Sequence, residues 1–179
     1  MLNFLGKSIE LPELLESKEI RRVNQLSLLS LYTNKPVILV CFTVVMPGKV
    51  KQNTVEDLVF SAGLKALETA FSPLIIKKEI HKKATGTEAF LLLKNITGAE
   101  AKKRCIELEQ SKAYARLWDF DCLDSKGVPI SRENLGAEER KCLICNKNAR
   151  LCYKERTHSK NELLAKVLEL AKEIENERT

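Results

Sequence analysis

The chain has 179 residues, of which 44% are apolar and 30% charged, and its net charge is +6. This length fits one domain, and the composition supports an apolar core with a soluble surface, which excludes disordered and fibrous classes. No stretch approaches the roughly 18–20 apolar residues of a membrane span, and the N-terminus lacks the features of a signal peptide. We therefore expect a cytoplasmic protein without a membrane partner, whose six cysteines are reduced thiols or metal ligands.

The first part of the chain predicts a helix, a buried strand and a second helix. Pro12–Leu31 carries an approximate apolar stripe among charges, as an amphipathic helix does. Val37–Val45 is dense in β-branched residues and predicts a buried strand. Asn53 is a favourable N-cap for the next helix, which Pro73 closes.

The middle of the chain predicts two strands, a helix and one more strand. Leu74–Ala84 and Thr87–Lys94 are strands around a turn. Thr97 and Glu100 form a capping box at the start of a helix, and Ala113–Leu123 reads as a strand.

This order of elements predicts an α+β fold. Strand, helix, strand, strand, helix, strand is the split βαβ, or ferredoxin-like, pattern, an antiparallel sheet with helices on one face. We expect a single domain over residues 1–179 with a core at about 36–124, preceded by the N-terminal helix. A Cys/His-rich element at 136–179 follows, made of a cysteine-containing loop and a last helix capped by Ser159.

Asp119 and Asp121 are the first candidates for chemistry. Alternation along a strand places both carboxylates on the same face. Two rigidly held carboxylates are a common way to bind Mg²⁺ while substrate phosphates complete its coordination. The alternative is two acids on the wet face of a strand end, although the apolar neighbours Trp118 and Phe120 make unpaired carboxylates costly there.

A second candidate group lies in the C-terminal loop. Cys142, Cys145, Cys152 and His158 provide three thiolates and an imidazole, a donor set that suits tetrahedral Zn²⁺. Two alternatives stay open. His158 could act as a general base, or the cysteines could pack as small apolar residues.

Positive charge is concentrated in the same region. Residues 138–160 carry seven cations and three anions, which accounts for four of the six net charges. Such a patch suits phosphate groups, acidic proteins or nucleic acid.

Several segments together resemble the apo-citrate lyase phosphoribosyl-dephospho-CoA transferase family, also called citrate lyase holo-acyl-carrier-protein synthase. The matches run in order through nearly the whole chain, and the cysteine signature near the C-terminus is the most specific of them. They comprise Ser17, Glu19, Arg21 and Gln25, Phe42–Val45 with Pro47 and Gly48, Gly86 with Glu88, Ile106–Glu109 with Ser111, Arg116–Asp119 with Asp121, Ser131 with Arg132, and Arg140, Cys142, Cys145, Ala149, Cys152, Thr157 and His158.

The resemblance implies a nucleotidyltransferase reaction. The donor would be 2′-(5″-triphosphoribosyl)-3′-dephospho-CoA, and the acceptor a serine of the acyl carrier (gamma) subunit of citrate lyase. A phosphodiester would form and pyrophosphate would leave. The basic face would meet the acidic surface usual in carrier proteins.

The same resemblance implies roles for individual residues. Asp119 and Asp121 would hold Mg²⁺, and Glu107 or Glu109 could be the base for the serine. Candidates for substrate binding are Arg21, Lys51, Arg116, Arg132 and Arg140.

An RNA-binding module is the alternative from a different class, since RNA-recognition motifs share this topology and zinc knuckles bind RNA. The third strand lacks the glycine and paired aromatics of that motif, and aromatic residues are only 6% of the chain. We therefore expect no nucleic-acid partner.

Overall fold

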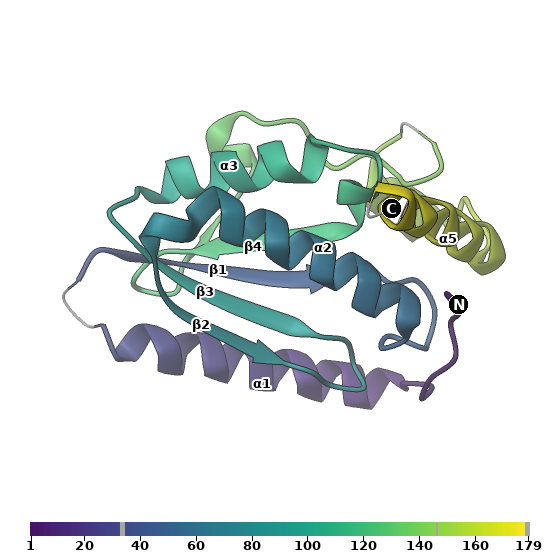
Figure 1. The fold of residues 1–179 in the computed structure, drawn as a ribbon, viewed down its shortest axis with the longest axis horizontal. Helices are drawn as coiled ribbons and strands as arrows, with labels where there is room; N and C mark the ends of the chain where they lie inside the picture. The colour runs from purple at the N-terminus through teal and green to yellow at the C-terminus, as the bar shows by residue number, and fades with distance from the viewer. Residues whose placement is uncertain (33–34, 146, 178–179) are drawn as a thin grey trace.

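The structure is a computed structural model that describes residues 1–32, 35–145 and 147–177. Its elements follow one another as in Figure 1. The helices are α1 (Leu11–Ser30), α2 (Thr54–Phe71), α3 (Gly98–Gln110), α4 (Ala149–Glu155) and α5 (Lys160–Glu177). The strands are β1 (Val37–Val44), β2 (Ile75–His81), β3 (Glu88–Lys94), β4 (Trp118–Leu123) and β5 (Pro129–Ile130). Short 3₁₀ turns are η1 (Ser72–Leu74), η2 (Tyr114–Leu117) and η3 (Glu133–Leu135).

Side-chain caps begin the helices where the sequence predicts them. The Asn53 carboxamide oxygen accepts hydrogen bonds from the backbone N–H groups of Val55 and Glu56, each at 3.0 Å. Thr97 and Glu100 form the predicted capping box of α3. These contacts satisfy N–H groups that a helix start otherwise leaves without a partner.

Within the described residues, the five strands form one antiparallel sheet in the order β2–β3–β1–β4–β5. β1 lies at its centre, where Cys41 is opposite both Phe90 of β3 and Asp121 of β4. β1 and β2 both pair with β3, so they run in the same direction on either side of it. The predicted α+β class with an antiparallel sheet is confirmed.

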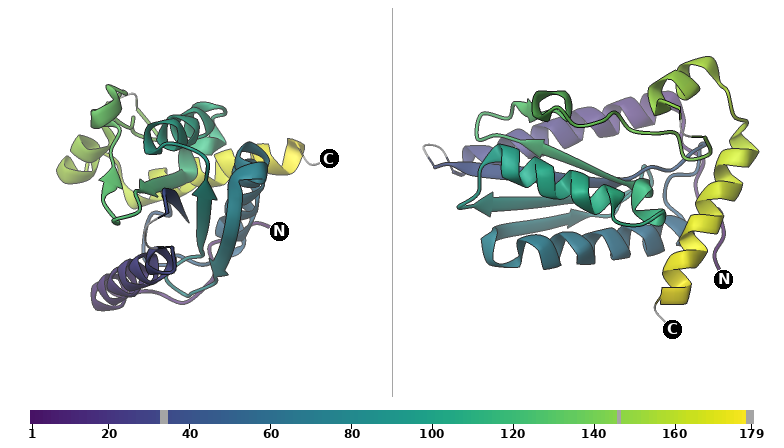
Figure 2. Two further views of the ribbon diagram at one scale, coloured as in Figure 1. Left: turned by 90° about the vertical axis from the view of Figure 1, so that its left-hand side faces the viewer. Right: turned by 90° about the horizontal axis from the view of Figure 1, so that it is seen from above.

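Helices cover both faces of this sheet: α2 and α3, the two helices of the predicted core, lie on one face, and the N-terminal helix α1 lies on the other (Figure 1). Val40 and Phe42 of β1 face the core beneath α2 and α3. Leu39 and Cys41 point the other way and pack with Leu28 of α1. Figure 1 and the left view of Figure 2 show α1 on the side of the sheet opposite α2 and α3. Such two-sided burial explains why β1 is a continuous apolar run rather than an alternating one.

The sequence predicted one strand over Ala113–Leu123, and the structure corrects this prediction. Residues 114–117 form the turn η2, and β4 begins only at Trp118. Tyr114 and Leu117 are buried in the core from the turn. Their apolar side chains therefore reflect burial and not strand pairing. The sequence also gave no indication of β5 or α4.

The last helix packs across the end of the sheet where β4 begins (Figure 2). Its residues Val167, Leu170 and Ile174 join the core that α2 and α3 share. The Tyr114 hydroxyl donates to Glu177 at 2.8 Å and so links α5 to η2. Among the described residues, no helix has the length and apolar character to cross a membrane.

Candidate active site

Asp119 and Asp121 lie on the same face of β4, as alternation predicted. Their neighbours Trp118, Phe120 and Cys122 are buried in the opposite direction, in the core beneath α2 and α3. Both aspartates are accessible, and the side chain of Asp119 is 43% exposed. The two aspartates lie on the same face of the sheet as α1. That helix covers another part of this face, and the part around the aspartates is open.

The two carboxylates interact electrostatically. The pKa of Asp121 is raised from its ordinary value of 3.8 because the surrounding protein reduces its solvation and because Asp119 adds a second negative charge nearby. The Lys102 ammonium acts in the opposite direction. A divalent cation between the carboxylates would remove the repulsion, so the donor chemistry fits Mg²⁺.

Side chains from α3 replace a neighbouring strand along part of β4. β5 pairs only with Cys122 and Leu123. At Phe120, the backbone N–H donates to Glu109 Oε1 at 2.8 Å, and the carbonyl accepts from Lys102 Nζ at 2.7 Å. Both charged side chains are buried, and each satisfies a backbone group that β5 leaves unpaired.

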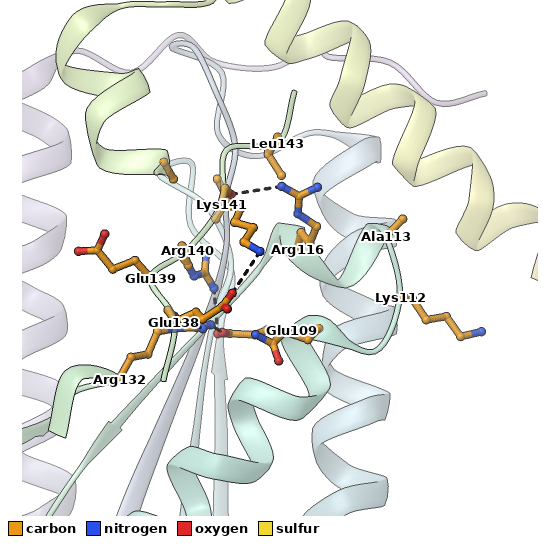
Figure 3. A pocket seen from close by; sticks show the side chains of 13 residues that line it. Glu109, Lys112, Ala113, Arg116, Arg132, Glu138, Glu139, Arg140, Lys141 and Leu143 are labelled. Carbon is orange, nitrogen blue, oxygen red and sulfur yellow. Dashed lines mark hydrogen bonds and ion pairs between the residues drawn. The ribbon is translucent and has the colours of Figure 1, made fainter. Parts of the chain in front are cut away.

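Glu109 also holds two arginines. Arg140 Nη2 lies 2.8 Å from Glu109 Oε1, and Arg132 Nη2 donates to Glu109 Oε2. Arg140 additionally contacts the carbonyl of Trp118 and lies 3.3 Å from Asp119 Oδ1. Figure 3 shows the two guanidinium groups meeting at the Glu109 carboxylate. A single buried acid thereby positions two cations beside the aspartate pair.

Arg116 approaches from the turn η2. Its Nη2 donates to the carbonyl of Lys141 at 3.2 Å and to that of Cys142. The arginine is therefore held by the start of the cysteine-containing segment (Figure 3). Arg116, Arg132 and Arg140 thus come from different segments and line one cavity.

Two adjoining cavities define the site. The first, of about 450 Å³, has five cations and three acids among its lining residues. Its charged lining residues are Lys112, Arg116, Arg132, Arg140, Lys141, Glu109, Glu138 and Glu139. The second, of about 540 Å³, contains Asp119, Asp121 and Lys102 and shares Arg132 and Arg140 with the first. A cationic cavity suited to phosphates thus adjoins a cavity that contains the aspartate pair and whose lining has five acids and four cations.

Lys102 is a residue of this site that the sequence reasoning missed. It is 5% exposed, and it lines the second cavity. A signal was present, because Lys102 and Glu109 are seven residues apart and share a helix face with the buried Cys105. Charged residues on the apolar stripe of a helix indicate specific partners.

Other predicted residues lie outside the two cavities. Arg21 donates to Glu88 at 2.9 Å, and Lys83 pairs with the same buried carboxylate. Lys51 donates to the carbonyl of Met46 at 2.6 Å, and its pKa is lowered by desolvation and by nearby Lys18. Arg21 and Lys51 thus bind groups of the protein itself, away from the two cavities.

The two predicted glutamates differ sharply in their surroundings. Glu107 is exposed on α3 and lines neither cavity. Glu109 is buried between β4 and two arginines, with hydrogen bonds or ion pairs to both carboxylate oxygens.

The cysteine and histidine residues meet, as their pattern predicted. The donor atoms of Cys142, Cys145, Cys152 and His158 all lie within 4.8 Å of one another. Cys145 Sγ is 3.5 Å from Cys152 Sγ and 3.3 Å from His158 Nε2. Zn–S bonds of about 2.3 Å in a tetrahedron separate ligands by about 3.7 Å, so the cluster is compatible with a zinc ion.

The turn around Cys142 also favours a thiolate. Desolvation acts to raise the pKa of Cys142, but hydrogen bonds from the backbone amides of Cys145 and Ile144, together with those from the Cys152 and Cys145 side chains, outweigh it, and the pKa is lowered. Amides directed at a cysteine sulfur stabilise the form that binds metal.

Comparison with known proteins identifies the family to which this fold and site belong. The family model for "Apo-citrate lyase phosphoribosyl-dephospho-CoA transferase" matches residues 9–174. Proteins of that name from Escherichia coli O1:K1 and Shigella flexneri serotype 5b are each 33% identical over 171 residues, covering 94% of this chain and 91% of theirs. "Protein CitXG" of Haemophilus influenzae is 36% identical over 169 residues, which cover 93% of this chain.

The chain spans only 36% of the length of the Haemophilus protein, whereas it spans nearly all of the other two relatives. The family match includes α1, the whole sheet, both cavities and the Cys/His cluster, and it reaches into α5. The chain therefore belongs to the apo-citrate lyase phosphoribosyl-dephospho-CoA transferase family.

Proposed function

We propose that this protein transfers the 2′-(5″-triphosphoribosyl)-3′-dephospho-CoA group to a serine of the acyl carrier (gamma) subunit of citrate lyase. A phosphodiester forms between the serine oxygen and the phosphorus nearest the ribose, and pyrophosphate leaves. The observation that carries the proposal is the cationic cavity beside the Asp119–Asp121 pair, in a chain that belongs to this family.

The arginines suit the triphosphate. Guanidinium groups bind phosphate oxygens bidentately, and Arg116, Arg132 and Arg140 all line the cationic cavity. Arg132 and Arg140 are anchored through Glu109, so they are positioned before the donor arrives. Prepositioned cations stabilise charge on a departing pyrophosphate without reorganisation during the reaction.

Asp119 and Asp121 are the residues that would hold Mg²⁺. The ion would neutralise charge on the phosphates and orient the reacting phosphorus. Lys102 lines the same cavity, where its charge acts on Asp121, and it holds β4 through the Phe120 carbonyl.

Of the two glutamates predicted as a base, Glu109 acts as a positioning residue in this proposal. Both its oxygens are already engaged, so neither is open to the serine hydroxyl. Glu107 is accessible but lies away from the cavities, and its role stays a prediction.

The carrier protein would bind over the basic C-terminal segment. Leu151 and Tyr153 of α4 are 53% and 87% exposed, and exposed cations flank them. These cations are Lys147, Arg150, Lys154 and Arg156. An exposed apolar pair surrounded by positive charge suits an acidic partner surface. We also propose that the reaction takes place in the cytoplasm.

The RNA-binding alternative has little support in this fold. An RNA-recognition motif stacks bases on an open sheet face. Here α1 covers the face that α2 and α3 leave free, and Phe90 on it is 1% exposed.

The test combines purified protein with the apo carrier subunit, the donor and Mg²⁺. We expect stoichiometric pyrophosphate release and a matching mass increase on one serine of the carrier. Carrier with that serine replaced by alanine is the control. Pyrophosphate release without a mass increase, or neither signal, would contradict the proposal.

A further inference from the structure

The Cys/His cluster joins three separate segments of the C-terminal region. Cys142 and Cys145 lie in the turn before α4, Cys152 lies within α4, and His158 precedes α5. Neither Cys142 nor Cys152 belongs to the two apolar core clusters, although both are buried. Packing in the core therefore does not explain why these four side chains converge.

Backbone hydrogen bonds make the turn compact. The amide of Cys142 donates to the carbonyl of Lys147 at 2.7 Å, and the amide of Ala149 donates to the carbonyl of Arg140 at 2.8 Å. Lys141 and Asn148 form a β-bridge between these contacts. Arg140 is consequently fixed at the base of a turn whose loop carries two of the four donors.

The same turn holds Arg116. Its guanidinium donates to the carbonyls of Lys141 and Cys142, the second of which is a residue of the cluster. Leu143, between the two cysteines of the turn, lines the cationic cavity. The turn that carries Cys142 thus contacts Arg116 directly and holds the backbone of Arg140, whose side chain Glu109 also contacts.

We propose that Cys142, Cys145, Cys152 and His158 bind one Zn²⁺ ion, and that this ion positions Arg116 and Arg140 for the donor's triphosphate. Three soft thiolates and one imidazole within 4.8 Å select zinc over the hard cations Mg²⁺ and Ca²⁺. On binding, each thiol releases its proton to solvent. The four protein ligands complete a tetrahedron, so the ion is structural and carries no substrate.

The role assigned to the arginines rests on the proposed function, whereas the zinc site does not. Zinc content and binding of inorganic triphosphate can both be measured without the carrier or the natural donor. If the protein binds zinc and triphosphate but transfers nothing, the proposed function fails and this inference stands.

The first measurement is elemental analysis of purified, reduced protein. We expect about one zinc per chain in the wild type and in Cys105→Ala, which removes a buried thiol outside the cluster. Cys145→Ser and His158→Ala should lose the metal, and Co²⁺ in the wild-type site should show the visible absorption of tetrahedral thiolate coordination. A zinc-free wild type purified from zinc-containing medium, or unchanged zinc in Cys145→Ser, would overturn the assignment.

The second measurement is calorimetric titration with inorganic triphosphate. Loss of zinc should weaken binding by about tenfold, the equivalent of one charge-assisted hydrogen bond. His158→Cys preserves a zinc-binding donor set and should retain both zinc and triphosphate affinity, which His158→Ala should not. Where a variant does not fold, reversible chelation of the wild type replaces it, with affinity restored by added zinc. Unchanged triphosphate affinity in folded, zinc-free protein would overturn the positioning role.

Discussion

The ionised carboxylate of Asp121 is needed to bind a metal ion, but it lowers the stability of the metal-free fold. Its carboxylate lies beside Asp119 with reduced solvation, which raises its pKa. The folded chain therefore holds the Asp121 proton to a higher pH than the unfolded chain does. Between the two pKa values the folded state binds more protons, so the free energy of unfolding falls as pH rises. Ionised Asp121 at neutral pH thus destabilises the metal-free protein.

Asp121→Asn should abolish transfer while raising the melting temperature at neutral pH. The amide cannot replace an anionic Mg²⁺ ligand, and we expect at least a hundredfold loss of kcat/KM, about 2.7 kcal/mol in the transition state. The gain in melting temperature should be small, at most about a few degrees, because Asp121 is exposed and solvent screens the repulsion. The gain should shrink as the pH approaches 3.8, the ordinary value. Calorimetry across pH without Mg²⁺ checks the stability; lower stability at neutral pH would contradict the electrostatic account.

Glu109 and Glu107 provide a matched comparison on one helix. Glu109→Ala leaves two arginines and a backbone N–H without their acceptor, and loss of one partner from a buried ion pair costs about 3–5 kcal/mol. Glu109→Gln keeps an acceptor for Phe120 and should be affected less. Glu107→Gln, on the exposed face, should leave the free energy of unfolding nearly unchanged. Urea denaturation measures all three; equal stabilities would show that Glu109 does not hold the site together.

At the scale of elements, α2 packs unusually close to the sheet. A Cβ atom at Gly63 would lie 2.9 Å from Trp118 Cδ1 and would also collide with the Phe42 ring. The indole Nε1 of Trp118 donates to the carbonyl of Val59 on the same helix at 3.1 Å. The helix is therefore fixed against the first residue of β4, the strand that carries both aspartates.

Gly63→Ala should destabilise the protein although alanine is the better helix former. Overpacking against the aromatic rings costs about 1–3 kcal/mol, which offsets the roughly 1 kcal/mol gained in helix propensity. Ser61→Ala on the exposed side of α2 is the control and should be neutral or stabilising. The measurement is the midpoint of chemical denaturation. A midpoint for Gly63→Ala at or above that of Ser61→Ala would show that the helix can move away without cost.

At the scale of the whole molecule, charge is distributed unevenly. Residues 138–160 hold four of the six net positive charges, and Lys147 and Lys160 are exposed within this segment. Surface cations of this kind steer association with an acidic partner, and their influence fades over about 8 Å at physiological salt.

Lys147→Glu combined with Lys160→Glu should raise the KM for the carrier protein by about tenfold at low salt, because electrostatic steering is lost. The KM of the double variant should also depend less on ionic strength than that of the wild type. The KM for the donor should change little. Lys65→Glu with Lys103→Glu makes the same change in net charge on exposed positions of α2 and α3 and is the control. A raised donor KM with an unchanged carrier KM would show that this patch binds the triphosphate instead.

The sequence by itself determined most of the helices and strands and the types of side chain that could bind a metal ion. β-branched density marked β1, side-chain caps marked α2 and α3, and alternation placed Asp119 and Asp121 on one face. These are local properties, because hydrogen bonds at a helix start and the period of a strand involve residues close in the chain. The cysteine and histidine spacing likewise predicted a cluster that the fold brings together.

Only the tertiary structure decided what surrounds those residues. Apolar side chains at Tyr114 and Leu117 indicate burial equally in a strand or in a turn, so the start of β4 depended on packing against α2 and α5. The roles of Lys102 and Glu109 depended on where β5 stops pairing, which left the Phe120 backbone to be satisfied by α3. A charged side chain is buried only where distant segments supply its partners, and such long-range pairing has no local signature in the sequence.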